Sequence, residues 1–177
     1  MNVLKFILCI IVIGCFSLGM SAEVKSNKKI IGIYEKVLLL PEGIKMPAKL
    51  DTGADISSIH GENIGVFKKD GKKYVKFLFN WDKNGLDEQL KIEKPFVRYI
   101  SVKRKGGLKS ERRPVVKLEF CLDGEKYASE FSIAERDNFR YPLLLGREFL
   151  RKLFIIDPDG DFLTNIDKCD KYIKNDN

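Results

Sequence analysis

Residues 48–60, AKLDTGADISSIH, constrain the fold more than any other part of the sequence. Apolar residues flank Asp-Thr-Gly-Ala, which is typical of a strand that ends at a carboxylate, turns sharply and continues as a second strand. Gly53 permits a positive φ or the close approach of another backbone, Thr52 adds a hydroxyl beside Asp51, and Ala54 leaves room. Two interpretations are open: an ordinary Asx-type turn, or an acid presented at a strand end for chemistry.

A second stretch favours the chemical interpretation. Residues 141–150, YPLLLGREFL, place an apolar run before Gly146 and Arg147, 95 positions after Asp51. Together the two stretches resemble the retropepsin-like aspartic proteases, in which an apolar strand and its Gly pass beside the aspartate loop. More closely, the chain resembles a bacterial retropepsin-like group long labelled ATP-dependent zinc proteases. The resemblance runs over about residues 30–163 and includes Ile31-Gly32-Ile33, Glu35-Lys36-Val37, Glu111-Arg112-Arg113-Pro114-Val115-Val116 and Phe139-Arg140-Tyr141-Pro142.

The resemblance implies an all-β fold, a retropepsin-like closed barrel or sandwich of short strands with one short C-terminal helix at residues 147–152. It also implies a catalytic loop, in which the threonine hydrogen-bonds across a dimer interface, and a supporting shell that includes an ion pair between Asp55 and Arg147. The implied catalytic residues are Asp51, Thr52 and Gly53, and the implied structural supports are Ala54, Asp55, Gly146 and Arg147.

The chemistry of peptide hydrolysis then predicts a dimer. Two carboxylates that share one proton can supply both a base for the attacking water and an acid for the leaving nitrogen. The chain holds a single Asp-Thr-Gly and no Asp-Ser-Gly, so the second carboxylate must be Asp51 of another copy. We therefore expect a homodimer that acts on a peptide or protein substrate and needs no cofactor and no metal.

Two Asp-Gly pairs and one Gly-Gly pair mark hairpin turns. Asp70-Gly71 and Asp123-Gly124 each separate strand-like segments, as in two-residue hairpins. Gly106 and Gly107 are the flap candidate, because retropepsin-like enzymes close a mobile hairpin over the substrate between the aspartate loop and the Leu-Gly-Arg segment. An ordinary surface hairpin is the alternative there.

The first residues have the layout of a secretory signal peptide. Lys5 precedes an apolar run over residues 6–16, and small residues follow at Ser21 and Ala22. We therefore expect a signal peptide at residues 1–22, a linker at 23–29, the protease domain at 30–165 and a polar tail at 166–177, with export to the periplasm. An uncleaved leader that anchors the chain, and a lipid on Cys15, are the alternatives.

The remaining cysteines and the histidine argue against a metal enzyme. Beyond the leader only Cys121 and Cys169 remain; the first lies in an alternating strand-like run, and whether the two pair is open. His60 is the only histidine, which excludes a zinc site built from two histidines at the usual helical spacing, and no Gly-Lys-Ser/Thr phosphate loop is present for ATP. We expect His60 to have a structural role.

The positive charge of the chain is concentrated in one segment. The net charge is +7, and residues 98–117 hold eight basic residues against one acid. Because Tyr99 is the only aromatic residue among them, we expect no nucleic-acid partner, and instead a peripheral contact with the anionic cell envelope. The alternatives to an endopeptidase are a catalytically silent retropepsin-fold binding or scaffold protein, and a zinc-dependent protease as the older label says.

Overall fold

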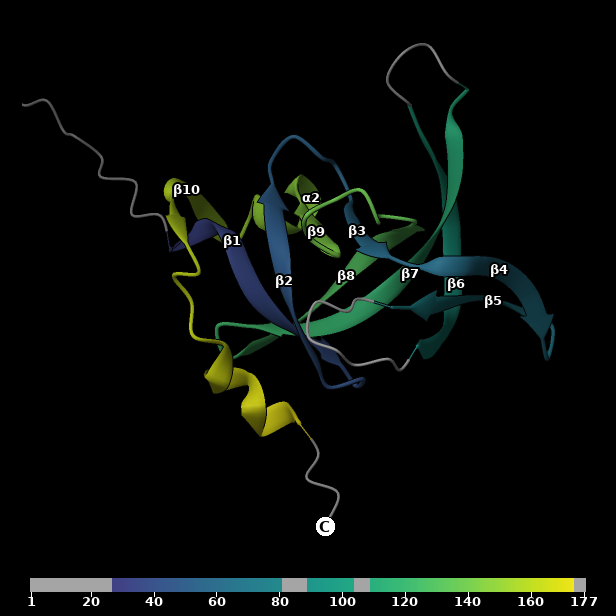
Figure 1. Cartoon of the computed structure of the whole chain (residues 1–177), viewed down its shortest axis with the longest axis horizontal. Coiled ribbons are helices and arrows are strands. Elements are labelled where there is room, and N and C mark those ends of the chain that lie inside the picture. Colours follow the sequence, from purple (N-terminus) through teal and green to yellow (C-terminus); the bar gives the residue numbers. More distant parts are fainter. Residues whose placement is uncertain (1–26, 81–88, 104–108, 174–177) are drawn as a thin grey trace, which may run out of the picture.

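The computed structural model describes residues 27–80, 89–103 and 109–173, which form a closed barrel with two projecting hairpins (Figure 1). No helix among these residues is long and apolar enough to cross a membrane. The strands are β1 (Lys29–Leu40), β2 (Ile44–Asp51), β3 (Ser57–His60), β4 (Glu62–Lys69), β5 (Lys72–Phe79), β6 (Leu90–Val102), β7 (Glu111–Leu122), β8 (Glu125–Ala134), β9 (Leu143–Gly146) and β10 (Phe154–Asp161); the helices are α2 (Arg147–Leu150) and the 3₁₀-helix η2 (Ile166–Tyr172).

The barrel closes because β1 pairs on both of its sides. The sheet order β1-β2-β9-β3-β8-β7 returns to β1 through the pairing of residues 38–40 with 119–121, so six strands surround the core. The retropepsin-like, all-β prediction is therefore confirmed. Not all strands are as short as expected, since β1 runs without a break over 12 residues.

Aromatic rings fill one end of the barrel. Phe120 lies edge-on to Phe131 and Phe149, with ring centroids 5.7 and 5.1 Å apart. Phe149 belongs to α2, which is one turn long and was predicted over residues 147–152. Phe149 and Leu150 are both buried. Their burial anchors this short helix to the core and so fixes the chain immediately after Gly146.

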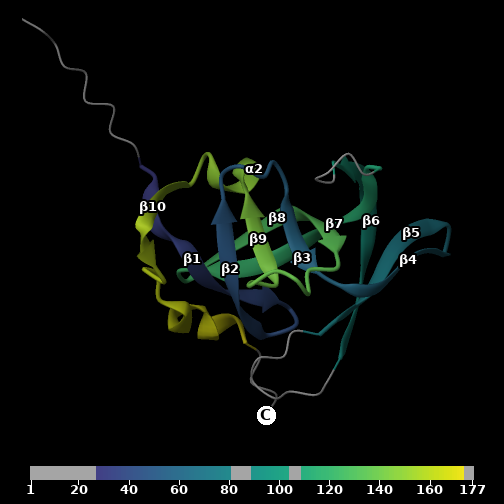
Figure 2. The ribbon, with the colours of Figure 1, turned by 45° about the horizontal axis from the view of Figure 1, so that its top comes forward.

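Two hairpins, β4–β5 and β6–β7, extend beyond the barrel, as Figure 2 shows. The β4–β5 hairpin turns at Asp70-Gly71 and the β7–β8 hairpin at Asp123-Gly124; φ is 49° at both aspartates and 74° and 79° at the two glycines. Positive φ at both central residues is the type I′ geometry that matches strand twist, so both turn predictions are confirmed. The second projecting hairpin is β6–β7, whose strands flank residues 104–108.

The C-terminal segment differs from the polar tail that was expected. Residues 166–172 form η2, in which Cys169 is fully buried against Leu38 and bonded to Cys121 of β7. The open question of the two cysteines is thus answered by a disulfide across 48 positions. The predicted leader, 1–22, lies outside the described residues, as does most of the linker.

A buried carboxylate holds the same segment to the barrel. Glu35 on β1 is 0% exposed and accepts hydrogen bonds from the backbone N–H groups of Gly32, Leu163 and Thr164 and from the Thr164 hydroxyl, at 2.7–3.1 Å. Four donors replace the water that this carboxylate loses on burial. Glu35 is therefore a structural residue that joins β1 to the chain after β10.

We expect Glu35→Gln to lower the free energy of unfolding by about 2–3 kcal/mol, because the amide has one acceptor oxygen and brings an NH₂ group against N–H donors. Urea unfolding of the oxidised protein measures the loss. Glu125→Gln is the control, since the Glu125 side chain is 58% exposed and its pair with Lys29 contributes about 0–1 kcal/mol. Equal losses in the two variants would contradict the anchoring role.

Candidate functional site

Asp51 lies at the end of β2, where the chain turns toward β3. Its Oδ1 accepts the Gly53 N–H at 3.0 Å, and its Oδ2 lies 3.5 Å from the Lys49 ammonium. The carboxylate is 27% exposed, and Thr52 and Gly53 beside it are exposed. The loop therefore presents an oriented carboxylate at the surface, with no second carboxylate of the Asp-Thr-Gly kind in the chain.

Gly146 is the residue that allows β9 to pass beside this loop. It pairs in parallel with Asp51, and a Cβ placed on it would lie 2.5 Å from the Ile56 carbonyl carbon and 2.9 Å from the Asp55 oxygen. Both contacts are with backbone, which has little freedom to move aside. Only glycine therefore permits this approach.

Because Gly146 lets the two segments lie close together, backbone hydrogen bonds join the start of α2 to the aspartate loop. The N–H groups at the start of α2 donate to the aspartate loop: Arg147 N–H to the Ala54 oxygen at 2.7 Å, and Glu148 N–H to the Asp55 oxygen at 2.9 Å. The loop that carries Asp51 is thus held by the strand and helix predicted to support it.

A serine cluster behind the loop was not anticipated from sequence. Ser57 Oγ accepts the Gly146 N–H at 3.0 Å, Ser132 Oγ donates to the Ser57 carbonyl, and Ser58 Oγ donates to the Ser132 carbonyl. All three serines are buried. They satisfy polar groups where β3, β8 and β9 meet, and an Ile-Ser-Ser-Ile run gives no signal for such a role until the strands are paired.

The predicted ion pair between Asp55 and Arg147 is present, and the Arg147 guanidinium also donates to the Thr52 carbonyl at 3.5 Å. Both side chains are exposed, at 70% for Asp55 and 54% for Arg147. Water and salt screen such a pair, so it contributes about 0–1 kcal/mol. The meeting of the two segments consequently depends on Gly146 and on backbone hydrogen bonds.

A cleft of about 650 Å³ opens beside the aspartate loop. Residues 53–56 form one wall, and the end of β6 and the start of β7 form another through Ile100, Val102 and Arg113. Asp51 lies at the edge of the cleft and does not line it. The flap candidate, Gly106 and Gly107, lies outside the described residues, but the β6 and β7 strands on either side of it do reach this cleft.

Three arginines form a positive wall of the cleft, which the acidic Asp55 and Glu148 also line. Arg98 and Arg113 each pair with a glutamate, at 2.8 Å from Glu130 and Glu111 respectively. Arg113 Nε is buried with no hydrogen-bond partner among the described residues. Arg136 is 5% exposed and forms no ion pair within the described part of the chain. Burial, followed by repulsion from Arg113, lowers the pKa of Arg136 to about 10, so it stays charged at neutral pH.

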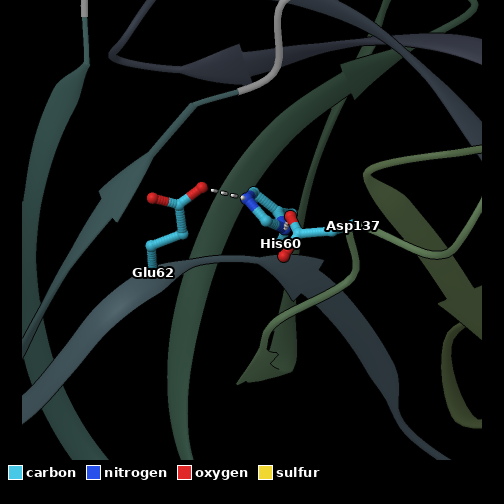
Figure 3. Close-up of side chains that lie close together, drawn as sticks. All are labelled: His60, Glu62 and Asp137. Carbon is cyan, nitrogen blue, oxygen red and sulfur yellow. Dashed lines mark ion pairs between the residues drawn. The ribbon is translucent and has the colours of Figure 1, made fainter.

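His60, Glu62 and Asp137 form a second cluster of titratable groups at the far end of β3 (Figure 3). His60 is 0% exposed; its Nε2 lies 3.5 Å from Glu62, and its Nδ1 lies 3.6 Å from Asp137 and accepts the Arg136 N–H at 3.0 Å. The carboxylates therefore flank different ring nitrogens, and the Nδ1 lone pair is engaged. One ligand atom from each of the three residues lies within 4.8 Å of the others. Zinc nevertheless needs three or four ligands with free lone pairs, and a histidine whose Nδ1 already accepts an N–H and whose two nitrogens face different carboxylates does not fit the ion that the older label implies.

Comparisons with known proteins agree with this geometry. A family model described as retropepsin-like aspartic endopeptidase RimB, RimB-like, matches residues 30–166. Proteins named probable alpha-L-glutamate ligase match from Shewanella pealeana, 34% identical over 77% of this chain, and from Shewanella halifaxensis, 32% identical over 77%. The chain spans 30% of the length of each of these two relatives.

A solved structure from Legionella pneumophila, of a protein of unknown function, superposes with a TM-score of 0.64 and 30% identity, and the match covers 77% of this chain and 98% of that one. The match therefore includes almost the whole of that protein.

We expect Gly146→Ala to lower the free energy of unfolding by about 3 kcal/mol, because the new methyl group meets backbone atoms at Ile56. Gly65→Ala is the matched control, since its methyl would meet only the flexible Lys76 side chain. Denaturant unfolding compares the two. A Gly146→Ala variant as stable as Gly65→Ala would mean that the close approach is unnecessary.

Proposed function

Because this chain belongs to the RimB-like family of retropepsin-like aspartic endopeptidases, we propose that it hydrolyses peptide bonds with a water activated at Asp51. The observation that carries the proposal is the partly exposed, oriented Asp51 carboxylate beside a cleft that the β6–β7 hairpin borders. A purely structural Asx turn would not require a strand with glycine at the contact point. The ligase activity in the names of the relatives is not assigned to this chain, which spans only part of them.

The proposed mechanism uses one Asp51 from each of two copies. Two adjacent carboxylates cannot both stay ionised, so one holds the proton that protonates the leaving nitrogen while the other takes a proton from the attacking water. Gly53 N–H steadies one oxygen of each carboxylate at 3.0 Å. The exposure of Thr52 and Gly53 leaves the loop tip accessible to a partner copy, and Thr52 would hydrogen-bond across that interface.

We further propose an acidic peptide as the substrate. The support is the positive wall of the cleft, above all the buried Arg136 without an ion pair and the unpartnered Nε of Arg113 among the described residues. Guanidinium groups bind carboxylates through short, charge-assisted hydrogen bonds. The glutamate in the names of the Shewanella relatives is compatible with this chemistry.

Export is the proposed setting. The apolar leader at residues 6–16 and the buried Cys121–Cys169 disulfide both support an oxidising compartment such as the periplasm. There, a basic chain of net charge +7 would also contact anionic envelope polymers.

Replacement of the Asp51 carboxylate tests the chemistry. We expect Asp51→Asn to reduce peptide hydrolysis by about 10²- to 10⁴-fold, because the amide can act neither as base nor as acid. Light scattering should show that the active species is a dimer. Asp167→Asn is the control, since its carboxylate is 75% exposed on η2 and does not line the cleft. If the Asp51→Asn variant kept full activity, the hydrolysis would come from a contaminating enzyme. The chain would then be better described as a catalytically silent binding protein.

Charge-matched peptides test the substrate. We expect kcat/KM for a glutamate-rich peptide to exceed that for its glutamine counterpart by about tenfold or more, with the ratio falling as salt screens the arginine wall. A lysine-rich peptide should be cleaved least. Equal rates for all three peptides would remove the acidic-substrate proposal while leaving the endopeptidase proposal intact.

The site of leader removal tests export. Mass spectrometry of the protein from its native compartment should find an N-terminus near Ala22 or Glu23. An intact leader, or a lipid on Cys15, would show a membrane-anchored form instead.

A further inference from the structure

The buried side chain of His60 organises the loop that carries Arg136 into the cleft. His60 ends β3 and pairs in parallel with Ala134, the last residue of β8. Three hydrogen bonds join the end of β3 to residues 134–142: Gly61 N–H to the Ala134 oxygen at 3.0 Å, His60 N–H to the Pro142 oxygen at 2.8 Å, and Arg136 N–H to His60 Nδ1 at 3.0 Å.

Of these three bonds, the one to Nδ1 is the only one made by a side chain, and it holds the backbone of Arg136 itself. Because Nδ1 accepts an N–H, the neutral ring carries its proton on Nε2, which faces Glu62 at 3.5 Å. Figure 3 shows the ring between Glu62 on one side and Asp137 on the other. The ring is thereby fixed in one orientation at the base of the loop.

Both the side chain and the backbone of Arg136 are held by contacts within the loop. Its Nε donates to the Tyr141 oxygen at 3.4 Å, its guanidinium lies 4.4 Å from the centre of the Phe139 ring, and its carbonyl accepts the Phe139 N–H at 2.9 Å. The side chain lines the cleft together with Ser58 and Arg113. A buried arginine with its backbone anchored has one position from which to meet a ligand.

We propose that His60 is a positioning residue for substrate selection: by accepting the Arg136 N–H at Nδ1, it holds the Arg136 guanidinium where a carboxylate side chain of the substrate binds. The inference rests on the proposed endopeptidase function and its acidic substrate. It assigns the histidine no part in bond cleavage, because the ring lies behind the loop and does not line the cleft. It predicts an effect on the choice of substrate with little effect on the rate of the chemical step.

Two polar substitutions separate the acceptor at Nδ1 from the rest of the ring. His60→Asn places an amide oxygen near the position of Nδ1, whereas His60→Gln extends its amide toward the position of Nε2 and leaves the Arg136 N–H without its acceptor. We expect His60→Gln to raise KM for a glutamate-rich peptide by about tenfold, with kcat and the cleavage of a matched glutamine peptide nearly unchanged, and His60→Asn to restore a KM close to that of the unaltered chain.

Arg136→Gln completes the test as a double-mutant cycle. If His60 acts through Arg136, adding His60→Gln to Arg136→Gln should not raise KM further. Additive effects, or an equal fall in kcat for both peptides in His60→Gln, would overturn the inference and leave His60 as an ordinary core residue.

Binding measurements separate this inference from the proposed function. Fluorescence anisotropy of a labelled hexaglutamate peptide, measured on the Asp51→Asn background, needs no hydrolysis. Weaker binding in His60→Gln than in His60→Asn supports the inference even if the unaltered chain cleaves nothing. Absence of hexaglutamate binding in the Asp51→Asn chain overturns it.

Discussion

The contact of Gly146 with the backbone at Ile56 is the constraint on which the site depends. It lets β9 run parallel to β2 in register with Asp51, and it brings the first N–H groups of α2 to the carbonyls of the aspartate loop. Both of these backbone bonds are short, at 2.7 and 2.9 Å, and α2 is held in place by its buried Phe149 and Leu150. A side chain at residue 146 would separate the two segments, and the loop would then keep only its own turn hydrogen bonds.

This dependence explains why the exposed ion pair of Asp55 with Arg147 is a secondary feature. The charges meet because the backbones already lie together, and their solvent exposure limits the energy they add. The pair instead orients the Arg147 side chain over the Thr52 carbonyl. In the proposed dimer, that orientation would steady the residue expected to bond across the interface.

Local sequence predicted the features whose cause is local, and the resemblance predicted one that is not. The type I′ turns at Asp70 and Asp123 follow from the backbone freedom of an Asp-Gly pair. The meeting of residues 51 and 146 came from the resemblance, because spacing alone does not pair distant strands. The arginine wall, the serine cluster and the bonds to Glu35 were missed, since each depends on which strands become neighbours. The tail was expected to be polar and irregular because no local pattern shows that Cys169 is buried against Leu38.

Lys49 is the cation that lies beside Asp51 on β2. In the single chain the Lys49 ammonium lies 3.5 Å from Asp51 Oδ2. A dyad needs one of its two carboxylates to hold a proton, and a cation close to each would oppose that. Lys49 is 41% exposed and has a flexible side chain, so it can withdraw into water when a second Asp51 approaches. In the proposed dimer, the approach of a second Asp51 would therefore require the Lys49 side chain to move away, so that assembly rather than folding would complete the catalytic arrangement.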